Sequence, residues 1–211
     1  MSLPAAIPIF PLPNVVLFPN VFLPLHIFEP RYRSMVRDAL DTDRIIGMVL
    51  LQPGREADDA ERPAVYPIGC AGLITHSEPV GDDRFNIVLR GLEKFRIVGE
   101  QPGHAYRTAR IDALAEPGAD LDRAAMAQSR QRLEVLLASA VHHRGIERKL
   151  PSNVSDYDLV NALAQYVALE PIERQALLEC DGIMPRCRAL IELLEMKMLL
   201  SPGTATWAGM H

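Results

Sequence analysis

The sequence predicts an α+β protein in which an antiparallel β-barrel is followed by a C-terminal α-helical bundle. Two observations predict this order. Short apolar segments separated by turn residues fill the first half of the chain, which is typical of consecutive antiparallel strands. Apolar residues recur at helical spacing in the second half. We therefore expect a barrel domain over residues 1–117, a helical domain over 118–200 and a tail over 201–211.

The barrel half should contain short strands and one helix. Seven of the 17 prolines lie in the first thirty residues, and proline cannot donate a hydrogen bond to a sheet, so strands there must be short, edge-like or broken by turns. Pro30 is placed to begin a helix, where its missing N–H costs nothing. Residues 45–51 are apolar and predict a strand buried on both faces. Gly69 and Gly72 indicate a bulge or a sharp bend. The expected strands cover residues 7–10, 22–25, 45–51, 65–76, 85–90, 95–98 and 106–111.

Four helices are expected in the second half. Ser155 is a good N-cap, with Asp158 three residues later as a variant capping box. Pro171 begins the next helix. Each helix has one apolar face, and the residues expected on these faces are Leu133, Leu136, Leu137, Ala140 and Val141; Leu159, Leu163, Tyr166 and Val167; Ile172, Ala176 and Leu177; and Cys187, Leu190, Ile191, Leu194 and Met198.

Charge and hydropathy exclude several classes of function. The net charge is −5, which argues against a nucleic-acid partner and against an anionic membrane surface, because both need positive patches. The apolar stretch 15–28 is interrupted by Pro19, Pro24 and His26, so it is neither a signal peptide nor a membrane span. We therefore expect a cytoplasmic protein with no nucleic-acid or membrane partner.

Catalytic and metal-binding motifs are absent from the 211 residues. There is no phosphate-binding loop of the G-x-x-x-x-G-K-[ST] type and no G-x-S-x-G nucleophile motif. The three cysteines form no C-x-x-C pair. His142 and His143 are adjacent, so on a helix they point about 100° apart and do not share a metal ion easily. The sequence predicts no catalytic residue, no metal site and no cofactor.

Three stretches, taken together and in this order, resemble a known family. The first reads FPLPNVVLFP and then FLPLHIFEPRY (10–32), the second IGCAGLI (68–74) and then IVLRGLEKFRI (87–97), and the third ERQALLE (173–179). The combination resembles the N-terminal domain of Lon protease, most closely its stand-alone bacterial versions, over about residues 5–200. Lys94 stands where that family usually has arginine, which keeps the charge.

The resemblance implies a PUA-like pseudo-barrel followed by a helical bundle. In full-length Lon this region helps to recognise substrate polypeptides and assists assembly, while the ATPase and the Ser–Lys peptidase lie in later domains. We therefore expect a non-catalytic module that binds unfolded or extended polypeptide, with a protease or a chaperone as its partner protein.

The candidate binding residues are the apolar side chains of the proline-rich N-terminal segment. Four of the six phenylalanines lie in the first 28 residues. Aromatic side chains dominate both cores and interfaces, so both interpretations stay open for each of them. The candidates are Phe10, Phe18, Phe22, Leu25 and Phe28.

The alternative is an enzyme, or a binder of a small anionic molecule, that uses a cleft between barrel and bundle. Its polar site would contain Arg31, Arg90 and Arg96, although structural ion pairs explain these arginines as well. Glu29 belongs to the same set. It precedes Pro30 and should lie at a helix N-terminus, where a carboxylate meets unpaired N–H groups, so its structural role is preferred over a catalytic one.

Overall fold

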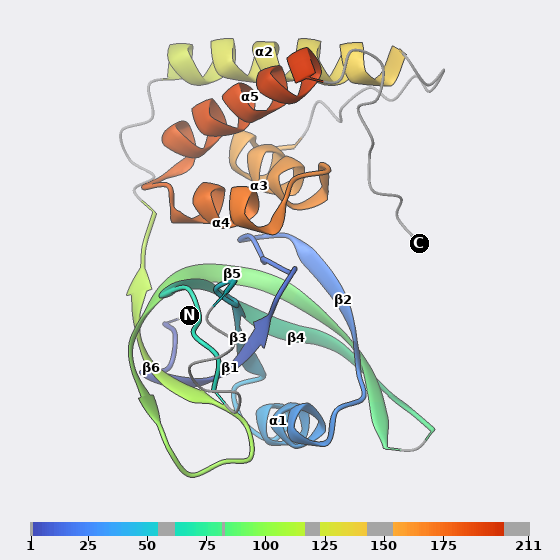
Figure 1. Cartoon of the computed structure of the whole chain (residues 1–211), viewed down its shortest axis with the longest axis vertical. Coiled ribbons are helices and arrows are strands. Elements are labelled where there is room, and N and C mark those ends of the chain that lie inside the picture. The colour runs from blue at the N-terminus through green and yellow to red at the C-terminus, as the bar shows by residue number, and fades with distance from the viewer. Residues whose placement is uncertain (1, 55–61, 82, 117–122, 143–153, 201–211) are drawn as a thin grey trace. The chain divides into compact units, whose positions relative to one another are not determined.

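The computed structural model describes residues 2–54, 62–81, 83–116, 123–142 and 154–200 (Figure 1). The chain divides into two compact units, Met1–Ala115 and Glu116–His211. This division falls two residues before the boundary expected from the sequence. The expected tail, 201–211, lies outside the described residues.

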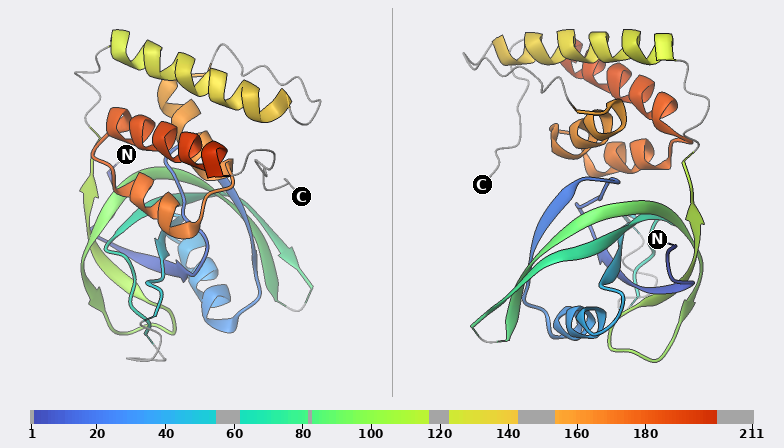
Figure 2. Two further views of the ribbon diagram at one scale, coloured as in Figure 1. Left: turned by 45° about the horizontal axis from the view of Figure 1, so that its top comes forward. Right: turned by 180° about the vertical axis from the view of Figure 1, so that it is seen from behind.

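Unit 1 contains a six-stranded sheet that closes on itself. The strands are β1 (Ala6–Leu12), β2 (Phe22–Ile27), β3 (Ile45–Leu50), β4 (Ile68–Val80), β5 (Arg84–Gln101) and β6 (Thr108–Leu114). Their order is β2–β5–β4–β3–β1–β6, and β6 also pairs with β5. The last pairing makes a ring of β5, β4, β3, β1 and β6, with β2 attached outside the ring, and the strands curve accordingly in Figure 2. The predicted barrel is confirmed as a five-strand ring with one added strand.

β5 is one strand of 18 residues where the sequence predicts two. Its first half pairs with β2 and its second half with β6, while β4 runs along the other edge of both halves. Both predicted segments, 85–90 and 95–98, lie within this strand, and the residues between them, Gly91 among them, continue it. The predicted bulge is present, because the register between β4 and β5 shifts between Cys70 and Gly72.

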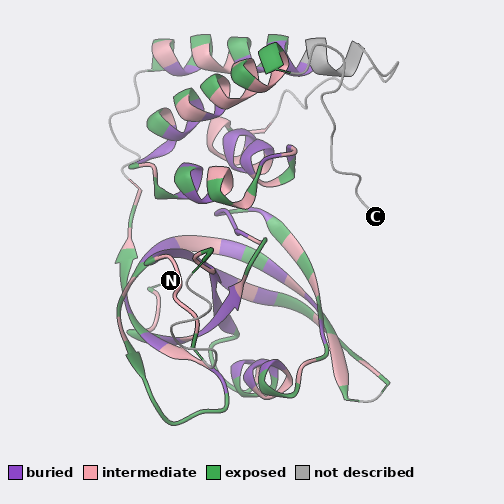
Figure 3. Cartoon of the chain, in the orientation of Figure 1, coloured by how far each residue is buried: buried purple, intermediate pink, exposed green. Residues whose placement is uncertain are grey.

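The sheet is mixed rather than antiparallel throughout. β1 runs parallel to β3, with Ile9 opposite Gly47. The chain passes through β2 and a helix between these two strands, and a connection of that length permits parallel pairing. All six residues of β3 are buried, as predicted. The core of the barrel contains Ile7, Ile9, Ile45, Val49, Ala71, Phe95, Ala109 and Ile111, and Figure 3 shows the buried residues along these strands.

The helix of unit 1, α1 (Pro30–Leu40), lies at one end of the barrel (Figures 1 and 2). Pro30 is in its first turn and Asp41 is its C-cap, as the sequence predicts. Tyr32, Met35, Val36 and Ala39 form its buried face. The Tyr32 ring lies 4.3 Å, centroid to centroid, from the Phe10 ring of β1.

Unit 2 contains α2 (Arg123–His142), α3 (Asp156–Tyr166), α4 (Pro171–Glu179) and α5 (Ile183–Leu200), and α5 packs against the other three. Ser155 caps α3, because its hydroxyl accepts a hydrogen bond from the Asp158 N–H at 3.1 Å. Ile172, Ala176 and Tyr166 were expected in the core and are exposed. In α4 Leu177 is buried as predicted, and the other inward positions are Gln175 and Leu178. Among the described helices, none is long and apolar enough to span a bilayer.

Candidate functional site

The two faces of β2 differ in exposure. Side chains alternate between the faces of a strand. Phe22, Pro24 and His26 are exposed, while Leu23 and Leu25 are half-buried and Ile27 is buried on the opposite face. β2 is the terminal strand of the sheet order, so one face and one edge of it lie outside the barrel ring.

The structure separates the predicted apolar residues into two groups. Phe22 and Phe28 are 51% and 61% exposed, whereas Phe10 and Phe18 are 5% and 0% exposed. Phe10 is buried because β1 has a neighbour on each side, β3 and β6, and its ring contacts Tyr32 of α1. The interpretation of Phe10 and Phe18 as accessible binding residues is therefore corrected, since their side chains belong to the core. Leu25 is half-buried on the inner face of β2.

The first half of β5 extends the outer face of β2. In the antiparallel register Phe22 lies opposite Arg90, Pro24 opposite Val88 and His26 opposite Asn86. Directly opposite residues share a face. His26 Nδ1 donates to Asn86 Oδ1 at 2.7 Å, and the His26 ring stacks on the Phe28 ring with centroids 6.2 Å apart. We call this surface the β2 face; it consists of Phe22, Pro24, His26, Phe28, Asn86, Val88 and Arg90.

Pro24 limits what the edge of β2 contributes. Gly91 N–H donates to the Val21 carbonyl at 2.9 Å, so the alternation of an antiparallel ladder turns the main chain of residues 23, 25 and 27 toward β5. The main chain of Pro24 then faces the outer edge, where proline supplies no N–H. A proline at that position makes the edge a poor template for a complete added strand. Side chains of the β2 face must therefore provide much of any recognition.

The predicted polar residues do not converge on one site. The Glu29 carboxylate accepts a hydrogen bond from Arg31 Nε at 3.0 Å and makes no side-chain cap hydrogen bond with α1, although Glu29 is the N-cap residue. Arg90 lies opposite Phe22, at the end of β2 remote from Glu29. Phe22 and Ile27, at the two ends of β2, are five residues and so about 17 Å apart. Arg96 is exposed six residues further along β5, about 20 Å from Arg90. The four residues are therefore not arranged to hold one small anion together.

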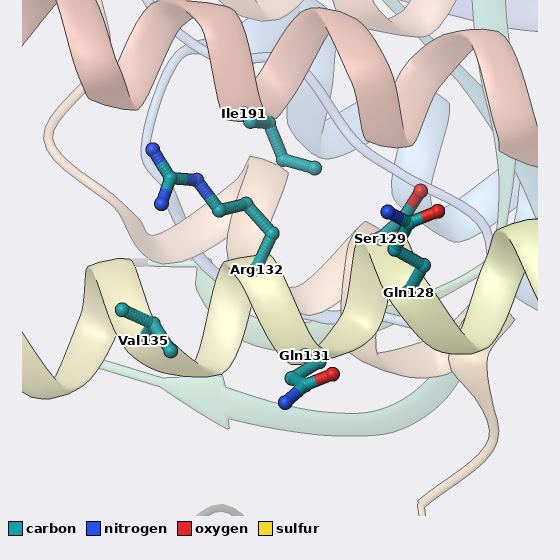
Figure 4. A pocket seen from close by; sticks show the side chains of 6 residues that line it. All are labelled: Gln128, Ser129, Gln131, Arg132, Val135 and Ile191. Carbon is teal, nitrogen blue, oxygen red and sulfur yellow. The ribbon is translucent and has the colours of Figure 1, made fainter.

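A hollow lies on unit 2 between α2 and α5. It has a volume of about 410 Å³, and Figure 4 shows that Ile191 comes from α5 and the other lining side chains from α2. Ser129 Oγ donates to the Ala125 carbonyl at 2.9 Å, and Arg132 pairs with Glu195 at 2.6 Å. Two of its polar side chains, Ser129 and Arg132, are thus engaged with neighbouring protein groups. Within the described ranges, no three His, Cys, Asp or Glu side chains come together as a metal site.

Comparison with known proteins identifies the family. The model of the ATP-dependent protease La (LON) substrate-binding domain matches residues 6–196, which is most of the chain. The chain belongs to this family. The outer face of β2 thus lies in a domain of a substrate-binding family.

The curated relatives are longer proteins. Lon protease 2 of Myxococcus xanthus is 28% identical over 200 residues, which cover 93% of this chain and 24% of the relative. Lon protease of Anaeromyxobacter dehalogenans is 27% identical over a segment of the same length. The chain thus spans about a quarter of the length of these relatives.

Solved structures share the fold. A Lon N-terminal domain protein from Xanthomonas campestris has a TM-score of 0.62 and 22% identity, over 89% of this chain and 97% of that one. The N-terminal domain of a Mycobacterium avium complex Lon protease has a TM-score of 0.66 and 17% identity, over 90% of this chain and 98% of that one. The α+β architecture is therefore that of Lon N-terminal domains.

The sequence analysis missed one buried polar group of this family member. Arg186 of α5 is fully buried and contacts Asn161, Glu116 and the Leu177 carbonyl. A signal for it exists in the sequence. Position 186 lies three residues after Ile183 and four before Leu190, on the apolar face of the helix, and a charged residue there requires a buried partner.

Proposed function

We propose that unit 1 binds unfolded or extended polypeptide through the β2 face, without nucleotide and without a chemical step of its own. The observation that carries the proposal is the pair of exposed phenylalanines at the two ends of an edge strand, in a chain of a substrate-binding family. Large exposed apolar side chains grouped on one surface mark interaction sites.

The size of the surface supports weak and broadly tolerant binding. Covering the exposed half of Phe22 or Phe28 contributes about 1 kcal/mol each, because a fully buried phenylalanine contributes about 2–3 kcal/mol. Micromolar affinity requires about 8 kcal/mol net of the entropy lost on association. Two phenylalanines therefore supply only part of the affinity, and contacts to Pro24, Val88 and the main chain must add to it.

We further propose that this binding takes place in the cytoplasm and delivers the polypeptide to a protease or a chaperone. Cys70, Cys180 and Cys187 are all free thiols, which suits a reducing compartment. The acidic net charge supports a protein client over a nucleic acid.

The test is a titration of the protein with a fluorescently labelled test protein in its folded form and in a permanently unfolded form. We expect binding of the unfolded form only. Phe22→Ser and Phe28→Ser should each weaken it about five- to tenfold, the equivalent of about 1 kcal/mol. Leu199→Ser is the matched control, because Leu199 is 82% exposed on α5, outside the β2 face.

Two results would overturn the proposal. One is equal, negligible binding of both forms of the test protein. The other is binding that Phe22→Ser and Phe28→Ser leave unchanged while both variants keep the thermal stability of the parent protein. An equal loss of binding in Leu199→Ser and Phe22→Ser would also contradict the proposal, because it would indicate nonspecific hydrophobic binding rather than recognition by the β2 face.

A further inference from the structure

We propose that the β2 face selects polypeptide segments in which an acidic residue lies two positions from the apolar residue that contacts Phe22. This inference rests on the proposed function and names the class of client. It follows from the positions of the charged side chains on and around the face.

Arg90 supplies the positive charge. It is exposed and lies directly opposite Phe22 in the β2–β5 register. Its Nη2 donates to Asn20 Oδ1 at 3.3 Å, and it forms no ion pair with any residue that the structure describes. No carboxylate of the described residues is therefore paired with the guanidinium that lies opposite Phe22.

The other charges near the face do not offset Arg90. At the Phe28 end, Glu29 and Arg31 neutralise each other in an ion pair of 3.0 Å. Glu78 of β4 is exposed opposite Asn86, four residues along β5 from Arg90 and so about 13 Å away. Charges that far apart at the surface are largely screened at physiological salt, where the Debye length is about 8 Å. Glu93 of β5 is three residues from Arg90, about 10 Å along the strand, which is also more than a Debye length. Of the charged side chains named here, Arg90 is therefore the one closest to Phe22, although the whole chain is acidic.

The geometry of an extended client brings its neighbouring side chains to this charge. Side chains on opposite residues of paired strands lie about 5 Å apart, so a group that packs on Phe22 is also beside Arg90. Residues two apart in an extended chain point to the same side. A carboxylate two positions from the packed apolar residue therefore comes within reach of the guanidinium, whose fork matches a carboxylate.

The experiment uses three fluorescent peptides of equal length, each with one central phenylalanine among Thr and Val. They carry Glu, Gln or Lys at both positions two residues from the phenylalanine, so the order does not depend on the direction of the bound chain. The parent protein should bind the Glu peptide about five- to tenfold more tightly than the Lys peptide, with the Gln peptide between them. This preference should disappear at about 0.5 M salt.

The variants are Arg90→Gln, Arg90→Glu and Arg90→Lys. We expect Arg90→Gln to bind the three peptides alike, Arg90→Glu to reverse their order, and Arg90→Lys to keep it. Arg96→Glu is the control, because Arg96 is also an exposed arginine of β5 but lies beyond the β2 face. It should keep the order of the parent protein. Thermal melting shows which variants are folded, and Arg90→Lys tests the role of charge even where Arg90→Glu does not fold.

The outcomes distinguish this inference from the proposed function. If the Gln peptide binds and the Glu and Lys peptides bind equally well, the selection of acidic clients is wrong and polypeptide binding stands. If the parent protein binds none of the three, the proposed function is itself overturned. A change of order in Arg96→Glu equal to that in Arg90→Glu would assign the effect to net charge and contradict a role of Arg90.

Discussion

Arg186 in α5 and Glu116, 70 residues earlier in the chain, form an ion pair in which the arginine is fully buried and the carboxylate nearly so. Arg186 Nη1 also donates to Asn161 Oδ1 at 2.6 Å, and Nε donates to the Leu177 carbonyl at 3.0 Å. One guanidinium thus joins the first residue of unit 2 to α3, α4 and α5. A buried charge is tolerated only with partners of this kind, so the pair holds the start of unit 2 in a defined place.

Replacing Arg186 should strongly destabilise unit 2. Arg186→Met leaves the Glu116 carboxylate buried without its partner, and breaking a buried pair in this way costs about 3–5 kcal/mol. The free energy of unfolding from urea titration measures this loss.

Arg132→Met is the control, because the Arg132–Glu195 pair is exposed and such pairs contribute at most about 1 kcal/mol. The double variant Arg186→Met with Glu116→Gln should be more stable than Arg186→Met alone, and equal losses in Arg186→Met and Arg132→Met would contradict the pairing argument.

Local patterns in the sequence predict the elements of this protein but not which face of each element is covered. β3 is recognisable because all its residues are apolar, and α1 because proline and an aspartate mark its ends. Phe10 and Phe22 lie in segments of similar composition, yet one is buried and the other exposed. The difference arises because β1 lies between two strands and beneath α1, whereas β2 pairs only with β5. Such neighbours are distant in the sequence, so no local pattern reveals them.

The sequence predicts residues of the candidate site but not which of them lie on one surface. Phe22 and Phe28 were expected together with Phe10 and Phe18, and nothing in the local sequence separates the exposed pair from the buried pair. Arg90 was expected as well, but in an anion site with Arg31 and Arg96. The place of Arg90 in the β2 face, opposite Phe22, depends on the register between β2 and β5, and that register is a property of the folded sheet.

Unit 2 should lose stability at alkaline pH. Burial raises the pKa of Tyr157 from 10.0 to about 12, with a further contribution from the Glu116 carboxylate, and burial raises the pKa of Cys187 from 9.0 to about 11. Each group is neutral when protonated, so between these values the unfolded chain binds fewer protons than the folded chain. The free energy of unfolding then falls as pH rises. We expect the loss to begin near pH 9 and to continue to about pH 12.

Urea titrations between pH 8 and pH 11 measure this slope. Tyr157→Phe and Cys187→Ala should each flatten it, because each variant removes one of the two groups. Tyr166→Phe is a control with a smaller expected effect, since Tyr166 is an exposed tyrosine at the other end of α3 with a pKa raised less by burial. A slope that both substitutions leave unchanged would show that other groups govern the alkaline transition.

Gly91 should be required for the placement of β2. A Cβ atom at this position would lie 2.0 Å from the Phe18 carbonyl oxygen and 2.8 Å from its carbon. Backbone atoms cannot rotate away as a side chain can, so in Gly91→Ala the segment before β2 must move. That segment is held by two hydrogen bonds of 2.9 Å, Asn20 N–H to the Gly91 carbonyl and Gly91 N–H to the Val21 carbonyl, and both are strained by the movement. Gly91→Ala should therefore lower the free energy of unfolding by about 1–3 kcal/mol.

Gly81→Ala is the matched control, because a Cβ there meets nothing within 4 Å. Equal melting temperatures for the two variants would refute the close approach of β5 to Phe18, whereas a selective loss in Gly91→Ala, together with weaker binding of unfolded protein, would tie the position of the β2 face to this one glycine.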